Sequence, residues 1–216
     1  MTEPQDAQSL ESQSNDDYIA TTIPVRIDID MKQAVLSLEE AEEVLRDANS
    51  IALGPCICRK EAQNCDAPID VCLSLNHAEG DLYEGFKPVS VGRALEALRT
   101  SHEAGLVHLA YRKPGQPITE FCSCCSCCCW LFKKLKATDY HESIVEANVI
   151  ARHDAEECAG CGACVDRCPF DAWLPSENGG KPSLQENRCF GCGICVTSCP
   201  ADAIRLVPRS SAREAV

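Results

Sequence analysis

The chain has 216 residues with 18 cysteines, a net charge of −13 and only 5% aromatic residues. It holds no apolar run of the about 18 residues that a transmembrane helix needs, which excludes a membrane-spanning protein. The first 20 residues carry five acidic side chains and no Lys or Arg, so we expect no secretory signal peptide.

Most of the negative charge lies in the N-terminal quarter of the chain. Residues 1–50 hold 12 acidic and three basic side chains, whereas residues 51–143 hold 11 and ten. Because the chain has no basic stripe that could displace counterions from phosphate, we expect no binding to free nucleic acid. The acidity fits either of two roles, attraction of a basic partner protein or simple solubility.

The first elements follow from local patterns. Residues 1–20 are polar and acidic, which predicts a disordered arm. Residues 25–30 alternate apolar and charged side chains, as expected of a half-buried strand or an extended arm. Ser37, followed three residues later by Glu40, forms a capping-box pattern that predicts a helix over residues 38–48.

Four further elements are predicted before residue 140: a strand at 51–53, a helix at 91–104 that ends before Gly105, a strand at 106–111 and a short amphipathic helix at 130–136. From about residue 143 the composition changes, with a strand expected at 145–152 and a loose tail at 209–216. We therefore divide the chain into a cysteine-rich N-terminal module, residues 21–142, and a C-terminal domain, residues 143–208.

The spacing of the cysteines favours metal binding over disulfides. Disulfide scaffolds are usually short and secreted, whereas this longer chain holds its cysteines in tight groups at intervals such as i, i+3 and i+6. Such spacing brings thiolates toward one point, as a metal centre requires.

Two cysteine blocks near the C-terminus repeat one another. Each follows the pattern Cys-x2-Cys-x2-Cys-x3-Cys-Pro. Both resemble the motif of bacterial-type ferredoxins, in which three close cysteines bind one [4Fe–4S] cluster and the fourth binds the other cluster. The resemblance implies a first cluster on Cys158, Cys161, Cys164 and Cys199. It implies a second cluster on Cys189, Cys192, Cys195 and Cys168.

The residues around these blocks agree with the resemblance. Glycines between the cysteines allow close approach of the backbone, and Pro169 and Pro200 fix the turn after each fourth cysteine. A pair of zinc sites is the alternative, because Cys-x2-Cys is also zinc spacing, but zinc does not account for two full repeats. Phe170 and Phe190 fit packing residues around the clusters better than electron conduits.

The N-terminal module contains a first group of four cysteines, Cys56, Cys58, Cys65 and Cys72. In an extended segment the side chains of Cys56 and Cys58 would point to one face, and the other two follow at equal intervals of seven. The four thiolates could hold one metal centre. We expect an iron–sulfur cluster there, and a zinc site or buried free cysteines are the alternatives.

A second group places six cysteines in eight consecutive residues, beginning at Cys122. A helical turn would align Cys122, Cys125 and Cys129 on one side and pair Cys124 with Cys128. Adjacent cysteines cannot all reach one ion, so we expect a subset to bind iron, namely Cys122, Cys124, Cys125 and Cys128. Free clustered thiols would be open to oxidation, which favours more than one N-terminal centre or a centre that both groups share.

Together these motifs, Gly-Pro-Cys-Ile-Cys-Arg-Lys and Phe-Cys-Ser-Cys-Cys-Ser-Cys-Cys-Cys ahead of the double block, resemble a family of ferredoxin-like proteins from anaerobes. Its members are described only as 4Fe–4S binding proteins, so the resemblance implies iron–sulfur redox chemistry without a defined substrate. Arg59 could donate to a cluster sulfur, bind an anionic ligand or form a surface ion pair. His108 could be a ligand or a proton donor, although a structural role fits better.

The sequence thus predicts an α+β protein in which a small cysteine-rich α/β module precedes a ferredoxin-like two-cluster domain. We expect an electron carrier that passes single electrons through two [4Fe–4S] clusters and at least one N-terminal cluster, to or from a partner oxidoreductase, in an anaerobic cytoplasm. Two alternatives stay open: an enzyme that reduces a small substrate at an open-site N-terminal cluster, and a redox or metal sensor.

Overall fold

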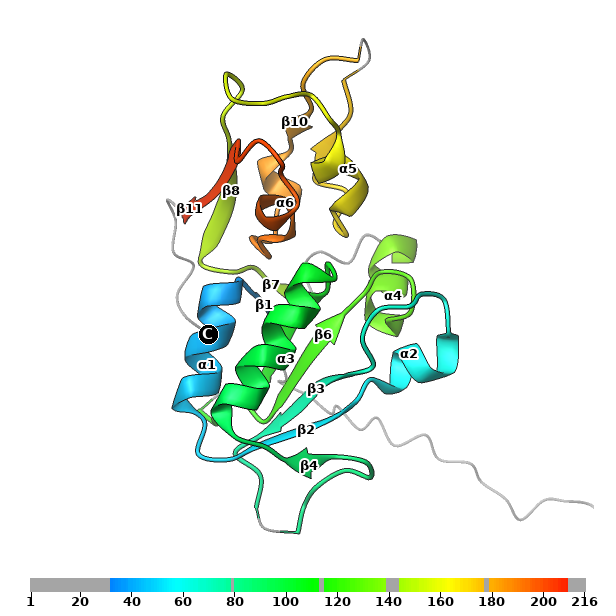
Figure 1. Cartoon of the computed structure of the whole chain (residues 1–216), viewed down its shortest axis with the longest axis vertical. Helices are drawn as coiled ribbons and strands as arrows, with labels where there is room; N and C mark the ends of the chain where they lie inside the picture. Colours follow the sequence, from blue (N-terminus) through cyan, green and yellow to red (C-terminus); the bar gives the residue numbers. More distant parts are fainter. Residues whose placement is uncertain (1–31, 79, 113–114, 139–143, 177–178, 210–216) are drawn as a thin grey trace, which may run out of the picture.

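The computed structural model describes most of the chain, namely residues 32–78, 80–112, 115–138, 144–176 and 179–209 (Figure 1). The expected acidic arm, the alternating segment at 25–30 and nearly all of the expected tail lie outside these ranges. Among the described residues, none of the helices combines the length and the apolarity that crossing a membrane requires.

The N-terminal module is built on a seven-stranded sheet with the order β4-β2-β3-β6-β5-β1-β7. In chain order its strands are β1 Lys32–Leu36, β2 Ile51–Pro55, β3 Asp70–Leu75, β4 Lys87–Pro88, β5 Val107–Arg112, β6 Glu120–Cys124 and β7 Ile144–Val145. Neighbouring strands are antiparallel except β1 and β7, which run parallel. The predicted strands at 51–53 and 106–111 are confirmed, but the sequence pattern does not predict β3 or β4.

Two helices, α1 (Leu38–Asp47) and α3 (Val91–Glu103), lie side by side over one face of this sheet (Figure 1). The predicted capping box is confirmed, because the Ser37 hydroxyl accepts from the backbone N–H of Glu40 and the Glu40 carboxylate accepts from that of Ser37, at 3.3 and 2.8 Å. After α3 the chain turns at Gly105, whose φ of +81° suits glycine. The helices and the sheet share one apolar core, which includes Leu45, Leu98 and Phe121.

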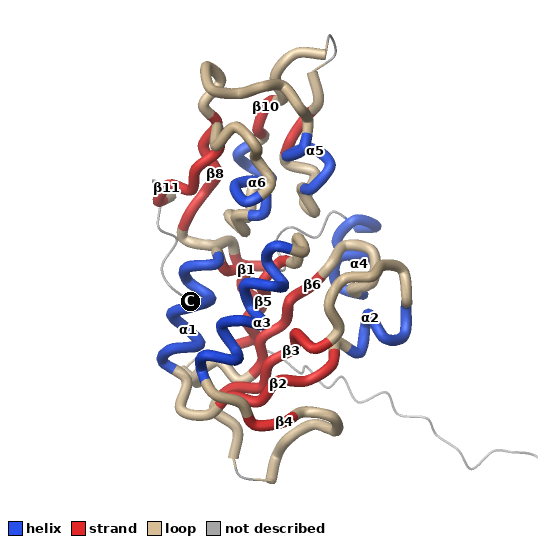
Figure 2. The backbone as a smooth tube through the Cα atoms, in the orientation of Figure 1, coloured by secondary structure: helices blue, strands red, loops and turns tan. Residues whose placement is uncertain are grey.

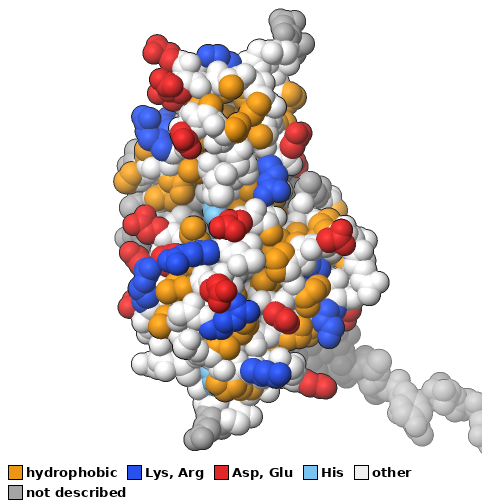
Figure 3. Space-filling view, viewed as in Figure 1, with side chains coloured by type: hydrophobic (Ala, Val, Ile, Leu, Met, Phe, Trp, Pro, Cys, Tyr) orange, Lys and Arg blue, Asp and Glu red, His pale blue; other side chains and the backbone are white. Residues whose placement is uncertain are grey.

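The outer side of α1 and α3 carries charges of both signs (Figure 3). Glu42 of α1 accepts hydrogen bonds from Arg99 of α3 at 2.8 Å and from Arg46 at 2.5 Å. The hydrogen bond from Arg99 is the main reason why the pKa of Glu42 is lowered. Pairs at such exposed sites typically contribute only ~0.2–1 kcal/mol, so the apolar core beneath holds the two helices in place.

Both cysteine-rich segments of this module depart from the predicted local structure. Cys56 is the N-cap of a short helix, α2 (Ile57–Ala62), so the expectation that residues 56–58 are extended is wrong. Cys122 and Cys124 lie on β6, so the expected helical turn through Cys122 is also wrong. The reason is tertiary: β6 pairs on one side with β5 and on the other with β3, which satisfies its backbone.

The C-terminal domain consists of two small antiparallel sheets and short helices. Strand β8 (Val149–His153) pairs with β11 (Ile204–Pro208), and β9 (Trp173–Leu174) pairs with β10 (Ser183–Leu184). Each cysteine block leads into a short helix, and a 3-10 turn precedes the second block; these elements are α5 Ala163–Arg167, η2 Glu186–Arg188 and α6 Ile194–Thr197.

The predicted strand at 145–152 is divided between the two parts of the chain. Its start, β7, extends the N-terminal sheet beside β1, whereas the rest, β8, belongs to the C-terminal domain. The short amphipathic helix predicted at 130–136 is confirmed as α4 (Trp130–Thr138). The whole is a mixed α/β structure in which the C-terminal domain is seated beside β1 and the end of α3 (Figure 2).

The two parts share a buried apolar core. Phe132 from α4 packs on Phe170, which stacks on Phe190, with ring centroids 5.3 and 4.4 Å apart. Val35 and Leu109 of the N-terminal sheet belong to the same core. All three residues are at most 5% exposed. Phe170 and Phe190 are therefore packing residues in the interface between the C-terminal domain and the N-terminal module.

Candidate metal centres

The thiol of Cys168, which ends the first cysteine block, lies beside the second block. Burial first, and then the neighbouring Cys189, raise its pKa. Burial also raises the pKa of Cys192 and of Cys195, and each of these interacts with both Cys168 and Cys189. These four sulfurs are the set that the resemblance to bacterial-type ferredoxins implies for the second cluster, so the residues present fit that group, and the ligation itself stays a prediction.

We call Cys168, Cys189, Cys192 and Cys195 the second quartet, and Cys158, Cys161, Cys164 and Cys199 the first quartet. The first quartet is less deeply buried than the second. Burial first, and then Cys158 and Cys161, raise the pKa of Cys164 to about 11, which places these three thiols together. Cys199 follows α6 and packs against the apolar core that contains Cys164. Cys161 is exposed, whereas three members of the second quartet are buried. The assignment of this set to the first cluster likewise stays a prediction.

Backbone N–H groups point at the C-terminal sulfurs. The N–H of Gly160 donates to Cys158 Sγ and that of Ala172 donates to Cys168 Sγ, each at 3.4 Å. Hydrogen bonds of this kind favour the thiolate form and tune the reduction potential of an iron–sulfur cluster. The first block therefore provides N–H donors to one sulfur of each assigned set, since Cys158 belongs to the first set and Cys168 to the second.

The ten N-terminal cysteines gather into two groups where β2 and β6 end and β3 begins. The first, called the six-sulfur group, consists of Cys56, Cys58, Cys72, Cys122, Cys124 and Cys129. The second, called the four-sulfur group, consists of Cys65, Cys125, Cys127 and Cys128. The structure thus joins cysteines from both sequence groups, and Cys65 contacts Cys125 and Cys128 at 3.8 Å each.

Hydrogen bonds link the thiols of the six-sulfur group into a chain. Cys56 pairs with Cys72 and Cys72 with Cys122. The thiol of Cys124 is shared between Cys122 and Cys129, and this sharing is the main reason why the pKa of Cys122 falls to about 5 and that of Cys129 to about 6. The lowered pKa values favour the thiolate form at Cys122 and Cys129, which is the form that binds metal.

Sequence reasoning missed two members of these groups, Cys127 and Cys129. Adjacent Cys128 and Cys129 enter different groups, because the chain turns here before α4 begins. One signal in the sequence could have identified Cys127 and Cys129. Neighbouring side chains in a turn point in different directions, so a run of consecutive cysteines can supply ligands to two separate sites.

Arg59 lies buried beside both groups, with only 1% of its surface exposed. Its Nη2 donates to the carbonyl oxygen of Ser123 at 3.2 Å and to Cys125 Sγ at 3.6 Å. Burial alone would lower the pKa of Arg59, but Cys125, Cys56 and Cys65 together hold it above its usual value. The option of a surface ion pair is therefore wrong. Arg59 donates to a cysteine sulfur, whereas donation to a cluster sulfur and binding of an anionic ligand both stay predictions.

A chain of hydrogen bonds through two histidines joins the module to the C-terminal domain. His108 contacts Ser123 Oγ through Nδ1 at 3.1 Å and His102 Nδ1 through Nε2 at 3.3 Å. His102 continues through Nε2 to Thr197 Oγ1 of α6 at 2.8 Å. Both ring nitrogens of His108 are occupied by these contacts, which supports its structural role.

We expect this histidine pair to make folding sensitive to acid. Burial first, and then His102, lower the pKa of His108 to about 3. Because the unfolded histidine titrates at pH ~6.5, the stabilisation is complete above that pH and is lost as the pH falls toward 3, with a limiting slope of about 1.36 kcal/mol per pH unit. A His108→Gln variant should lose less stability than the wild type between pH 7 and 5.

The measurement is the anaerobic thermal unfolding midpoint as a function of pH. A His77→Gln variant, which changes a histidine hydrogen-bonded to Ser50 instead, should keep the wild-type pH dependence. Parallel pH profiles for the wild type and His108→Gln would show that His108 does not carry the acid sensitivity.

Comparison with known families identifies one part of the chain. Residues 157–204 match the model of the 4Fe-4S dicluster domain, a span that contains both C-terminal cysteine blocks. The match supports at least one [4Fe–4S] cluster and an iron–sulfur electron-transfer role. No curated protein matches the chain.

Proposed function

We propose that this protein is an iron–sulfur electron carrier. It holds two [4Fe–4S] clusters on the C-terminal quartets, a further cluster in the six-sulfur group, and exchanges electrons with a partner oxidoreductase in a reducing compartment. The dicluster match over residues 157–204 carries the proposal, and the meeting of Cys168 with the second block supports it. Such clusters supply one-electron transfer when bound.

The positions of the three centres suggest an order for the electrons. Cys192 of the second quartet shares one buried core with Cys124 and Cys129 of the six-sulfur group. Protein interiors of this kind are close-packed and exclude water. The second quartet therefore stands between the N-terminal centre and the first quartet, whose Cys161 is exposed. We place the exchange with the partner protein at the first quartet.

The test is a reductive titration of the anaerobically purified protein, with iron and sulfide analysis and electron paramagnetic resonance. We expect about 12 irons per chain, one electron accepted per cluster and rapid transfer to ferric cytochrome c. Cys168→Ala should remove or alter the second cluster alone, and Cys199→Ala the first alone.

The matched control is Ser198→Ala, which changes the neighbour of Cys199 and should leave iron and electron uptake unchanged. A protein with fewer than about eight irons, or one that accepts no electrons, would refute the carrier role. Loss of the first cluster in Cys168→Ala would refute the crossover assignment while leaving the carrier role intact.

A further inference from the structure

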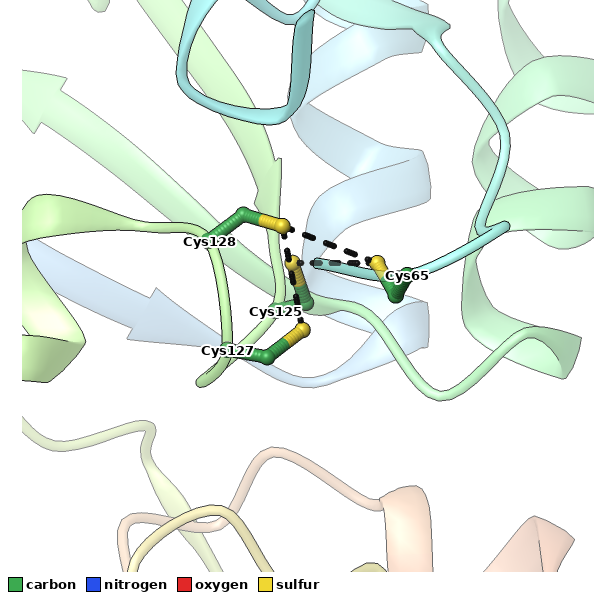
Figure 4. Close-up of side chains that lie close together, drawn as sticks. All are labelled: Cys65, Cys125, Cys127 and Cys128. Carbon is green, nitrogen blue, oxygen red and sulfur yellow. Dashed lines mark hydrogen bonds between the residues drawn. The ribbon is translucent and has the colours of Figure 1, made fainter. Parts of the chain in front are cut away.

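The four-sulfur group is more compact than the other cysteine sets. Its Sγ atoms all lie within 4.8 Å of one another (Figure 4). Three of the contacts, Cys65–Cys125, Cys65–Cys128 and Cys127–Cys128, measure 3.8 Å each. Across the described parts of the chain, this is the one group of at least three Cys, His, Asp or Glu side chains whose donor atoms are all so close.

This spacing fits a single tetrahedral ion. A Zn–S bond is about 2.3 Å long, so the edge of a ZnS₄ tetrahedron is about 3.8 Å. In a [4Fe–4S] cluster each thiolate binds a different iron, so its four ligand sulfurs stand farther apart. The C-terminal quartets, which belong to the segment that matches the dicluster domain, do not reach the closeness of the four-sulfur group.

The buried positive charge of Arg59 beside the group also favours thiolates that are bound to a metal ion over neutral thiols. The buried guanidinium of Arg59 donates to Cys125 Sγ, and its Nε has no partner. Among the described residues, no carboxylate pairs with Arg59. An isolated buried charge is costly. Four thiolates on one Zn²⁺ leave a net charge of −2, which gives Arg59 its counterion, whereas four neutral thiols would not.

The chain around the group is arranged as metal sites usually are. The backbone N–H of Asn64 donates to Cys128 Sγ, and that of Cys128 donates to Cys125 Sγ. Asn64 Nδ2 also donates to the carbonyl oxygen of Cys127 at 3.0 Å, which joins the segment after α2 to the turn after β6. Outer hydrogen bonds of this kind orient the ligands of a metal.

We propose that Cys65, Cys125, Cys127 and Cys128 hold one tetrahedral Zn²⁺ ion that is separate from the iron–sulfur clusters. Four protein ligands close the coordination sphere, as in structural zinc sites. The ion fastens the segment after α2 to the turn between β6 and α4, and so holds Cys58 and Cys129 in the six-sulfur group. Zinc has no redox chemistry, so the inference does not rest on the proposed electron transfer.

The test compares metal and sulfide contents of three anaerobically purified full-length proteins. The wild type should hold about one zinc per chain. The double variant Cys65→Ser/Cys127→Ser should lose zinc at least about tenfold while the iron of the C-terminal domain stays. Ser126→Ala, which lies between two of the ligands, is the matched control and should keep its zinc.

X-ray absorption at the zinc edge of the wild type keeps the test decisive even if the double variant fails to fold. Four sulfur neighbours at about 2.3 Å without an iron neighbour are expected. Iron in this site would overturn the assignment. It would be seen as a joint loss of iron and sulfide in the double variant, or as iron in excess of sulfide in the wild type. Zinc retained by the double variant would overturn the assignment as well. C-terminal iron, measured on the same samples, reports separately on the electron-transfer proposal.

Discussion

Replacement of Arg59 by Met is expected to cost about 3–5 kcal/mol of unfolding free energy and to empty the N-terminal metal sites. The guanidinium is 1% exposed and bonds to Cys125 Sγ and to the carbonyl oxygens of Ser123 and Pro68. Methionine fills a similar volume but carries no charge. Among the described residues, the thiolates would lose their cationic hydrogen-bond donor, and the carbonyl groups of Ser123 and Pro68 would lose the bonds from Arg59.

The matched control for this change is the next residue of α2. Lys60 is exposed, so Lys60→Met should change the unfolding free energy by less than about 0.5 kcal/mol. Arg59→Lys keeps the charge but loses the planar fork, so we expect an intermediate loss. Anaerobic urea unfolding, with zinc and iron analysis, measures all three. Equal stability of Arg59→Met and Lys60→Met would contradict the role assigned to the guanidinium.

Replacement of Gly191 by Ala is expected to destabilise the C-terminal domain by about 2–5 kcal/mol and to lower the loading of the second cluster. An added Cβ would lie 2.0 Å from the carbonyl oxygen of Val149 and 3.0 Å from Ala147 Cβ. The backbone also has a φ of +74°, which L-residues rarely adopt. Because Gly191 lies between Cys189 and Cys192, any shift that relieves the clash moves both sulfurs.

The repeat itself provides the control, since Gly160 occupies the same position in the first block. Its φ is +69°, and an added Cβ would lie at an ordinary 3.5 Å from the carbonyl oxygen of Gly180. Gly160→Ala should therefore lose only the free energy of unfolding that a side chain costs in this left-handed backbone conformation, about 1–2 kcal/mol. The thermal midpoint and the iron content of both variants measure the difference. If Gly160→Ala lost as much as Gly191→Ala, the contact with Val149 would not be the cause.

Several features of the molecule could be predicted from local sequence patterns. The pair Ser37 and Glu40 sets the start of α1, and Gly105 marks the end of α3, because caps and glycine turns act within a few residues. The double block of cysteines likewise identifies the dicluster domain, since its ligand spacing is written into consecutive residues.

The local structure around the N-terminal cysteines could not be predicted in the same way. The run that begins at Cys122 has helical spacing, yet it starts as a strand, because β6 is inserted between β3 and β5. Strand propensity depends on such neighbours more than helix propensity does. The position of Arg59 in the interior follows from the same sheet, since Ser123 of β6 provides one of its acceptors.

By itself, therefore, the sequence determined that this protein concentrates sulfur for metal binding and that its C-terminal domain is of the dicluster kind. Only the tertiary structure decided how the ten N-terminal cysteines divide, with Cys65 beside Cys125 and Cys128, and with Cys56 beside Cys72. The physical reason is that metal ligands must converge within a few ångströms. Residues about 60 positions apart reach that distance only when the pairing of strands brings their loops together.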